Sequence, residues 1–259
     1  MTYIPTTDFA LEVALGNVPG YSHINKFGQA LDCDNNITTD IWDGADGATS
    51  TDKWVAPTQA RIHALVSGND EDGGAGTDTG MLTCQVYGLA DWDTAESSEI
   101  VTLNGTTPVN TSGSYVIIHR IKGLTWGSAK VNLGIITATA ATDGTVTAAI
   151  QASKNQTLMA IYGVPSTQKL ALTTIHADVQ AFAASVDVTG VLLVQENVDS
   201  ADSAFVVKEP FHFTQLKDLD REYVNRKIFN GPCIIKVQVV ADQNNTVINA
   251  AFDGYVVDN

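Results

Sequence analysis

The sequence predicts an all-β protein, an antiparallel β-sandwich of jelly-roll-like form with an extended N-terminal arm. Three observations predict this fold. Short segments that alternate between apolar and polar residues recur throughout residues 59–259. Between them lie turn sequences rich in Gly, Asn and Asp, such as the Asn-Gly pair at residues 104–105. The sequence shows no sustained helical period, so helices are not expected to build the core.

The N-terminal part of the chain differs from the rest. Residues 1–58 are expected to form the arm, and residues 59–259 the β domain. A short helical turn is predicted at residues 9–15, but glycines and a proline between residues 16 and 28 interrupt any longer element. Apolar anchors among polar spacers are typical of a segment that lies across a surface, either a partner's or that of its own domain. These candidate interface residues are Tyr3, Phe9, Tyr21, Phe27, Ile41, Trp42 and Trp54.

The β domain is expected to begin with two alternating segments. In residues 61–66, the side chains of Ile62, Ala64 and Val66 are expected to face inward. The second segment, residues 82–87, places Cys84 on its apolar side, where a free cysteine serves as a small core residue.

Three turn sequences are each expected to join two neighbouring antiparallel strands. They are the Asn-Gly pair at 104–105, which favours a type I′ turn, the Asp-Gly pair at 143–144, and the Asn-Asn pair at 244–245. Residues 211–227 alone carry a charge density compatible with a helix or a polar sheet edge. The further expected strands are residues 100–103, 115–121, 131–138, 145–150, 158–164, 170–179, 186–194, 205–207, 235–239 and 247–257.

The overall charge and the cysteines indicate which binding partners and which cellular compartment to expect for this protein. A net charge of −15, from 29 acidic and 14 basic residues, argues against binding to nucleic acid or to an anionic membrane, because both need clustered Lys and Arg. The three cysteines are widely spaced without a CxxC pair, which argues against a disulfide framework or structural zinc. The N-terminal residues lack the pattern of a signal peptide, and no apolar run is long enough for a membrane helix. Synthesis without export is therefore expected.

The sequence contains none of four common catalytic or cofactor-binding motifs. Zinc-protease, nucleophile-elbow, phosphate-binding and dinucleotide-binding patterns are absent. His63, His119 and His176 fall within expected strands, where a structural role is favoured over metal ligation. A carboxylate pair for glycoside cleavage must face across a cleft, which proximity in sequence does not establish. The carboxylates considered for such a pair are Asp91, Asp93, Glu96 and Glu99. We therefore predict neither an enzyme nor a cofactor.

An acidic, glycine-rich loop at residues 67–80 is the weak candidate for a metal site. Asp70, Asp72 and Asp78 are oxygen ligands of the kind that Ca²⁺ takes. Their spacing is not that of an EF-hand, and solvated acidic loops are common. The sequence favours solvated aspartates here and leaves calcium as the alternative.

Several short segments, taken in order along most of the chain, resemble a family of tailed-bacteriophage virion structural proteins. Each is of turn-and-strand type, and the signal lies in their succession. The segments are Phe27-Gly28, Ile41-Trp42-Asp43-Gly44, Val86-Tyr87-Gly88-Leu89, Val101-Thr102-Leu103-Asn104-Gly105-Thr106, Asn132-Leu133-Gly134-Ile135-Ile136, Gln156-Thr157-Leu158-Met159-Ala160-Ile161-Tyr162-Gly163-Val164-Pro165 and Phe252-Asp253-Gly254-Tyr255.

This resemblance implies a non-enzymatic virion protein of an aquatic phage, made and assembled in the host cytoplasm. The first hypothesis is a capsid cement or decoration protein that binds the major capsid protein or other virion proteins. It would be a homo-oligomer, with a trimer around a local symmetry axis as one form. The alternatives are a tail or fibre component, or a receptor- or glycan-binding module, and, last, a hydrolase of host polysaccharide. The family has no catalytic motif, so no functional residue is carried over.

Overall fold

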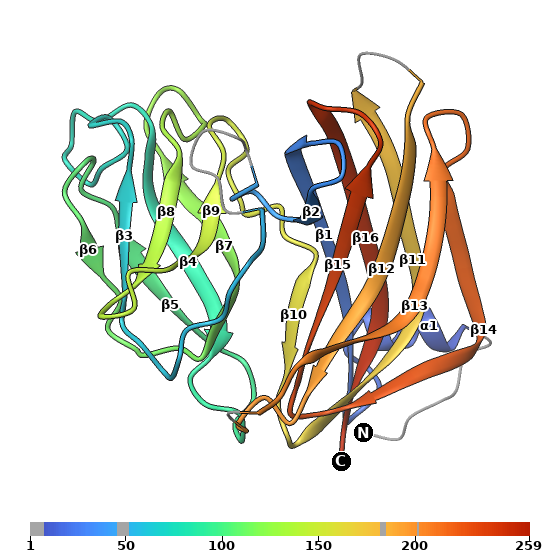
Figure 1. Ribbon diagram of the computed structural model, residues 1–259. Coiled ribbons are helices and arrows are strands. Elements are labelled where there is room, and N and C mark those ends of the chain that lie inside the picture. Colours follow the sequence, from blue (N-terminus) through green and yellow to red (C-terminus); the bar gives the residue numbers. More distant parts are fainter. Residues whose placement is uncertain (1–7, 46–51, 182–184, 201) are drawn as a thin grey trace.

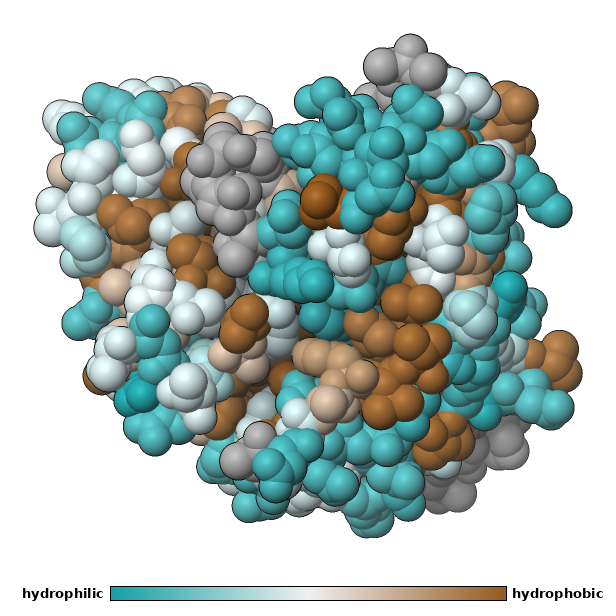
Figure 2. All heavy atoms as spheres, in the orientation of Figure 1, coloured by the Kyte–Doolittle hydropathy of each residue, from teal (hydrophilic) through white to brown (hydrophobic). Residues whose placement is uncertain are grey.

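The computed structural model describes residues 8–45, 52–181, 185–200 and 202–259, which form two lobes of antiparallel sheet (Figure 1). The all-β, antiparallel prediction is confirmed. In the first lobe the strand orders are β6-β3-β8-β9 and β5-β4-β7. In the second they are β1-β16-β11-β14 and β10-β15-β12-β13, and β2 pairs with β15. Figure 2 shows the surface hollowed between the lobes.

The bounds of the elements are as follows. The first lobe contains β3 (His63–Ser67), β4 (Met81–Leu89), β5 (Ser97–Thr102), β6 (Val109–Asn110), β7 (Ile117–Trp126), β8 (Ile136–Ala140) and β9 (Val146–Ile150). The second lobe contains α1 (Phe9–Ala14), β1 (Tyr21–Cys33), β2 (Thr38–Asp40), β10 (Ile161–Val164), β11 (Gln168–Ala181), β12 (Asp187–Glu196), β13 (Phe205–Thr214), β14 (Leu219–Asn230), β15 (Cys233–Ala241) and β16 (Thr246–Asp258).

In the predicted arm, residues 1–58, the stretch from α1 to β2 (residues 9–40) belongs to the second lobe. β1 pairs with β16 from Tyr21↔Val257 to Cys33↔Thr246, and β2 pairs with β15. The division at residues 58/59 is therefore wrong. The first lobe, with β3 to β9, is inserted in the sequence between β2 and β10 of the second lobe.

A glycine explains why this strand was missed. Gly28, which the sequence predicts to interrupt any longer element, lies within β1 where two other segments approach its backbone. A Cβ atom on Gly28 would lie 2.4 Å from the Ala160 nitrogen and 2.7 Å from the Ile41 carbonyl oxygen. A glycine inside a strand often marks such a close approach. The absence of a side chain on Gly28 leaves room for the Ala160 and Ile41 backbones against β1.

One of the three predicted hairpins is confirmed. β8 and β9 pair from Ile136↔Ile150 to Thr139↔Val146, and the turn between them contains Gly144 with φ +69°. The other two turns, at residues 104–105 and 244–245, connect strands that lie in different sheets, β5 to β6 and β15 to β16. Those two hairpin predictions are wrong, because a tight turn sets the local chain direction but not the strand that the next segment pairs with.

Two smaller expectations also differ from the structure. In β3 the buried residues are His63, Leu65 and Ser67. The face predicted to point inward, that of Ala64 and Val66, therefore points away from the core, and Ile62 just before the strand is 39% exposed. Residues 211–227 form parts of β13 and β14 rather than a helix. Each of these strands lies at the edge of its sheet, which confirms the polar-edge alternative. The predicted helical turn near residue 9 is confirmed as α1.

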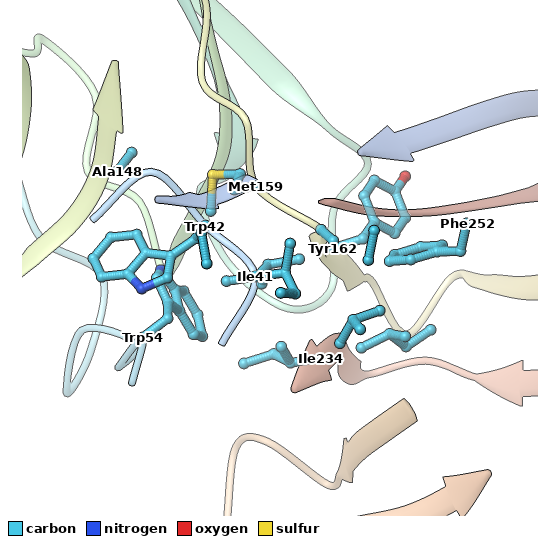
Figure 3. Close-up of a cluster of buried hydrophobic side chains, with 14 of the residues drawn as sticks. Ile41, Trp42, Trp54, Ala148, Met159, Tyr162, Ile234 and Phe252 are labelled. Atoms are coloured by element: carbon cyan, nitrogen blue, oxygen red, sulfur yellow. The ribbon is translucent and has the colours of Figure 1, made fainter. Parts of the chain in front are cut away.

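The core crosses from one lobe to the other around the segment that follows β2. The carbonyl oxygen of Ile41 accepts a hydrogen bond from the Ala160 nitrogen at 2.9 Å, and the Trp54 indole donates to the Thr147 carbonyl oxygen at 2.8 Å. Figure 3 shows the side chains of this interlobe core, which include Ile41, Trp42, Trp54, Ala148, Met159, Tyr162, Ile234 and Phe252.

The cysteines are buried and unpaired, and the prediction that Cys84 is a core residue is confirmed. Burial raises the pKa of each of the three thiols to about 12. Among the described residues, no helix is long and apolar enough to cross a membrane.

We predict that Gly105→Val lowers the free energy of unfolding by more than about 1 kcal/mol. Gly105 has φ +58°, and a Cβ atom there would lie 2.7 Å from the Asp70 carbonyl oxygen. Urea unfolding measures the change. Gly76→Val is the matched control, because a Cβ atom on exposed Gly76 would have nothing within 4 Å. Equal stability of the two variants would contradict the prediction.

Candidate functional site

The acidic loop is organised around a buried carboxylate. Asp72 is fully buried and accepts hydrogen bonds from the Ser67 hydroxyl at 2.7 Å and from the Met81 nitrogen at 2.8 Å. It also accepts from the nitrogens of Leu133, at 2.9 Å, and Gly134, at 2.8 Å. The expectation that this aspartate is solvated is wrong, because backbone N–H groups of Met81, Leu133 and Gly134 surround it.

The other two metal candidates do not join Asp72. Exposed Asp70 accepts hydrogen bonds from Thr106, which lower the pKa of its carboxyl group, and Asp78 accepts from the Ala75 nitrogen at 3.0 Å. In the part of the chain that the structure describes, no three His, Cys, Asp or Glu side chains come together in a way that could hold a metal ion.

The apolar anchors predicted from the sequence separate into buried and exposed sets. Ile41, Trp42 and Trp54 are buried in the chain's own core, so these three are not free to contact a partner. Phe27 is half-buried, and the Arg120 guanidinium lies 6.0 Å from its ring centre. Tyr3 lies outside the described residues.

Phe9 and Tyr21 remain exposed and lie together. Their ring centres are 5.5 Å apart in an edge-on arrangement. Two further residues near α1 are exposed, Leu11 at 51% and Leu15 at 62%. We call Phe9, Leu11, Leu15 and Tyr21 the α1 patch. Exposed apolar groups in one place are typical of an interaction surface.

A second apolar surface lies on the edge strands β13 and β14. The pairing of β14 with β11 is interrupted between Glu222 and Lys227, and Val224, within this interruption, is 89% exposed. Such a bulge protects a sheet edge from further pairing. The exposed aliphatic residues here are Val206, Val207, Leu216, Val224 and Ile228.

A polar pocket of about 230 Å³ lies between the lobes. We call it the Lys26 pocket. Strand β1 of the second lobe supplies one wall, β4 and β7 of the first lobe supply another, and β10 closes it. Its lining residues are His23, Ile24, Asn25, Lys26, Tyr87, Glu96, His119, Arg120, Lys122 and Tyr162.

Lys26 is the centre of this pocket and is only 4% exposed. Its ammonium nitrogen donates a hydrogen bond to the carbonyl oxygen of His119 in the opposite lobe. Burial, and then the positive charge of Arg120, lower the pKa of Lys26 well below its usual value. Arg120 in turn donates from Nη2 to the Asn25 carbonyl oxygen at 2.8 Å. Each lobe therefore binds the backbone of the other through a basic side chain.

A histidine and a glutamate form the adjoining wall. His119 Nε2 contacts Glu96 Oε2, and the ring centre of His119 lies 4.7 Å from that of Tyr162. Burial lowers the pKa of His119. Burial opposes ionisation of Glu96, yet the hydrogen bond with His119 brings its pKa below the usual value. The neutral imidazole thus donates from Nε2 to a carboxylate, and Nδ1, which is buried, has no hydrogen-bond partner among the described residues.

A second interlobe pocket, of about 740 Å³, is lined in part by Trp54, Trp92 and Phe205. Lys236 lies at its edge, where the ammonium is 2.5 Å from Asp40 Oδ2 and 4.3 Å from the ring centre of Phe205. Burial raises the pKa of Asp40 despite the ion pair. The Asp40 carboxylate therefore already supplies Lys236 with a charged acceptor.

Sequence reasoning missed the Lys26 pocket. Lys26 fell within the expected arm, and Glu96 was considered only as one of four carboxylates near each other in sequence. The signal available in the sequence is a lysine beside Phe27 within residues 21–33, the segment that forms β1. That signal does not reveal the lobe that the lysine reaches.

No known protein-family model, curated protein or solved structure matches this chain.

Stability is expected to fall on acidification, partly because of His63. Burial lowers the pKa of His63 from 6.5 to about 4, so between these values the unfolded chain binds a proton that the folded chain does not. Lowering the pH from 7 to 5 should therefore cost on the order of 2 kcal/mol through this residue. Urea unfolding at the two pH values should show a smaller loss for His63→Phe than for the unmodified chain. Exposed His212 provides the control: His212→Gln should keep the full loss, and equal losses in all three proteins would contradict this assignment.

We predict that Asp72→Ala destabilises the protein by more than about 3 kcal/mol, because it leaves three backbone N–H groups without this acceptor, two of them buried and that of Leu133 partly buried. Asp78→Ala, in the same loop, removes the acceptor of one backbone hydrogen bond and should cost about 1 kcal/mol. Thermal and urea unfolding measure both. A similar effect of the two variants would mean that Asp72 does not organise the loop.

Proposed function

We propose that this chain is a non-enzymatic virion structural protein of a tailed bacteriophage, a capsid cement or decoration protein that binds and stabilises the head shell. The observation that carries the proposal is the ordered series of segments that resemble such proteins. These segments begin in β1 and end in β16, so the resemblance extends over both lobes. In this proposal the protein is made in the host cytoplasm and resides in the virion.

The finer architecture is part of the same proposal. We infer that the two sheets of each lobe pack face to face as a sandwich. Support comes from the alternating burial along β3, β8 and β16, which contribute Leu65, Ile136 and Phe252, among others, to one continuous hydrophobic core. The crossing from β15 in one sheet to β16 in the other is typical of jelly-roll-like connections.

The α1 patch is the proposed contact with another virion protein, such as the major capsid protein. It includes two of the anchors expected from the sequence, Phe9 and Tyr21, in an exposed position. Apolar side chains buried by a partner contribute about 1.5–3 kcal/mol each, so a few of them suffice for attachment. A homo-oligomer, with a trimer as one form, would multiply these contacts on a symmetric shell.

A tail or fibre component, or a receptor- or glycan-binding module, is the second candidate. The Lys26 pocket favours it, because its volume suits a small ligand and its walls combine aromatic rings with hydrogen-bonding groups.

Copy number separates the two candidates. In a quantitative gel of purified virions beside the major capsid protein, a head decoration protein should be present in hundreds of copies per particle. A dozen copies or fewer would instead support the tail candidate. Absence from purified particles would contradict both.

We predict that the double variant Leu11→Ser/Leu15→Ser binds particles at least about tenfold more weakly, since two exposed anchors are lost. Both side chains are exposed, so the melting temperature should change little. Co-sedimentation with particles that lack the protein measures the binding. Deletion of residues 1–58 is unsuitable, because it removes β1 and β2.

The matched control is Val224→Ser/Ile228→Ser, which removes two exposed aliphatic residues from β14. It should bind particles like the unmodified chain. If instead only this control loses binding, the attachment lies on the β13–β14 edge and the assignment of the α1 patch is wrong.

A further inference from the structure

Positive charge is concentrated in the Lys26 pocket of an otherwise acidic protein. Lys26, Arg120 and Lys122 all line it, although the whole chain has only 14 basic residues against 29 acidic ones. Glu96 is the one acidic residue in the lining. A further carboxylate lies beside the lining, that of Asp253, which accepts a hydrogen bond from the Asn25 amide at 2.6 Å. The pocket therefore has an excess of cations over carboxylates.

The two central cations also have unused hydrogen-bond donors. An ammonium carries three N–H donors and a guanidinium five. Among the described residues, Lys26 Nζ donates to the His119 carbonyl oxygen and the Arg120 guanidinium to the Asn25 carbonyl oxygen. Both acceptors are neutral carbonyl groups. An anion in the pocket would supply the charged acceptor that neither side chain has, and charge-assisted hydrogen bonds of this kind are the stronger ones.

The rest of the wall suits a hydroxylated ligand. Glu96 offers carboxylate oxygens and Asn25 an amide, while Tyr87 and Tyr162 supply aromatic rings. A volume of about 230 Å³ is below the range typical of pockets for drug-sized ligands, so the ligand must be small, of the size of a single sugar ring. Glu96 would repel a ligand with negative charge on all sides, so the ligand must carry its charge at one end.

We propose that the Lys26 pocket binds a small organic carboxylate of monosaccharide size, an acidic sugar of the uronic acid class. Lys26 and Arg120 hold the carboxylate, and Glu96 and Asn25 bind hydroxyl groups. This inference is independent of attachment to a head shell, since the α1 patch and the pocket share no residues.

Binding should be coupled to the uptake of a proton. In the free protein, burial and Arg120 lower the pKa of Lys26, and a bound carboxylate raises it again. Affinity should therefore decrease as the pH rises through the lysine pKa of the free protein. The other titratable or charged groups that face Lys26 are Glu96 and His119, with His23, Arg120, Lys122, Tyr87 and Tyr162 around the pocket and Asp253 beside it.

Calorimetric titration of the full-length protein tests the proposal with D-glucuronate as the probe. D-glucose, acetate and inorganic phosphate are titrated in parallel. Glucuronate should bind saturably and more tightly than each of the other three. At pH values that reach the lysine pKa of the free protein, the heat of binding should differ between Tris and HEPES, which differ in ionisation enthalpy, in the direction of proton uptake.

Variants locate the site. Lys26→Met and Arg120→Gln should each weaken glucuronate binding at least tenfold, whereas Lys154→Gln, which removes an exposed lysine of the first lobe, should bind like the unmodified chain. Thermal unfolding checks that each variant is folded, and if Lys26→Met does not fold, Arg120→Gln decides the result.

Three results would overturn the proposal. The first is no saturable binding of glucuronate, or binding that Arg120→Gln leaves unchanged. The second is equally tight binding of glucose, which would remove the role of the carboxylate. The third is equally tight binding of phosphate or acetate, which would remove the sugar.

Discussion

The pairing of β1 with β16 is the constraint on which the rest of the structure depends. It joins strands from opposite ends of the chain, from Tyr21↔Val257 to Cys33↔Thr246, and so the second lobe is complete only when its last strand is in place. The first lobe is inserted within this closed arrangement. Contacts so distant in sequence make loop closure costly, and folding of such a topology is expected to be slow.

The interlobe seam combines apolar packing with buried charge. Around Ile41 and Trp42 the core passes without interruption from one lobe to the other. Two buried lysines line the pockets between the lobes, Lys26 bound to a carbonyl group and Lys236 paired with Asp40. Buried ion pairs contribute little net stability compared with apolar packing, because their desolvation is costly. Of these two contacts, only the hydrogen bond from Lys26 to the His119 carbonyl oxygen joins the two lobes, and its geometry restricts how they meet.

Much of the fold could be predicted from the sequence because strand periodicity is a local property. Segments such as β4, β11 and β16 alternate clearly, and Asp143-Gly144 joins neighbours that pair. The turns at residues 104–105 and 244–245 have equally good local chemistry, yet the chain crosses between sheets there. Which strands pair depends on packing over the whole chain. Strand β1 was not predicted, because the sequence does not show whether Gly28 lies in a loop or in a strand that other segments approach closely.

The candidate site was beyond sequence reasoning for a related reason. Asp70 and Asp72 are near neighbours in one acidic loop, but Asp70 is exposed and Asp72 fully buried. The difference arises from backbone donors at Leu133 and Gly134, some sixty positions away along the chain. Lys26 likewise acquires its environment from the opposite lobe. The composition of a segment predicts that it is polar, whereas the chemistry of its side chains is set by the distant segments that fold against it.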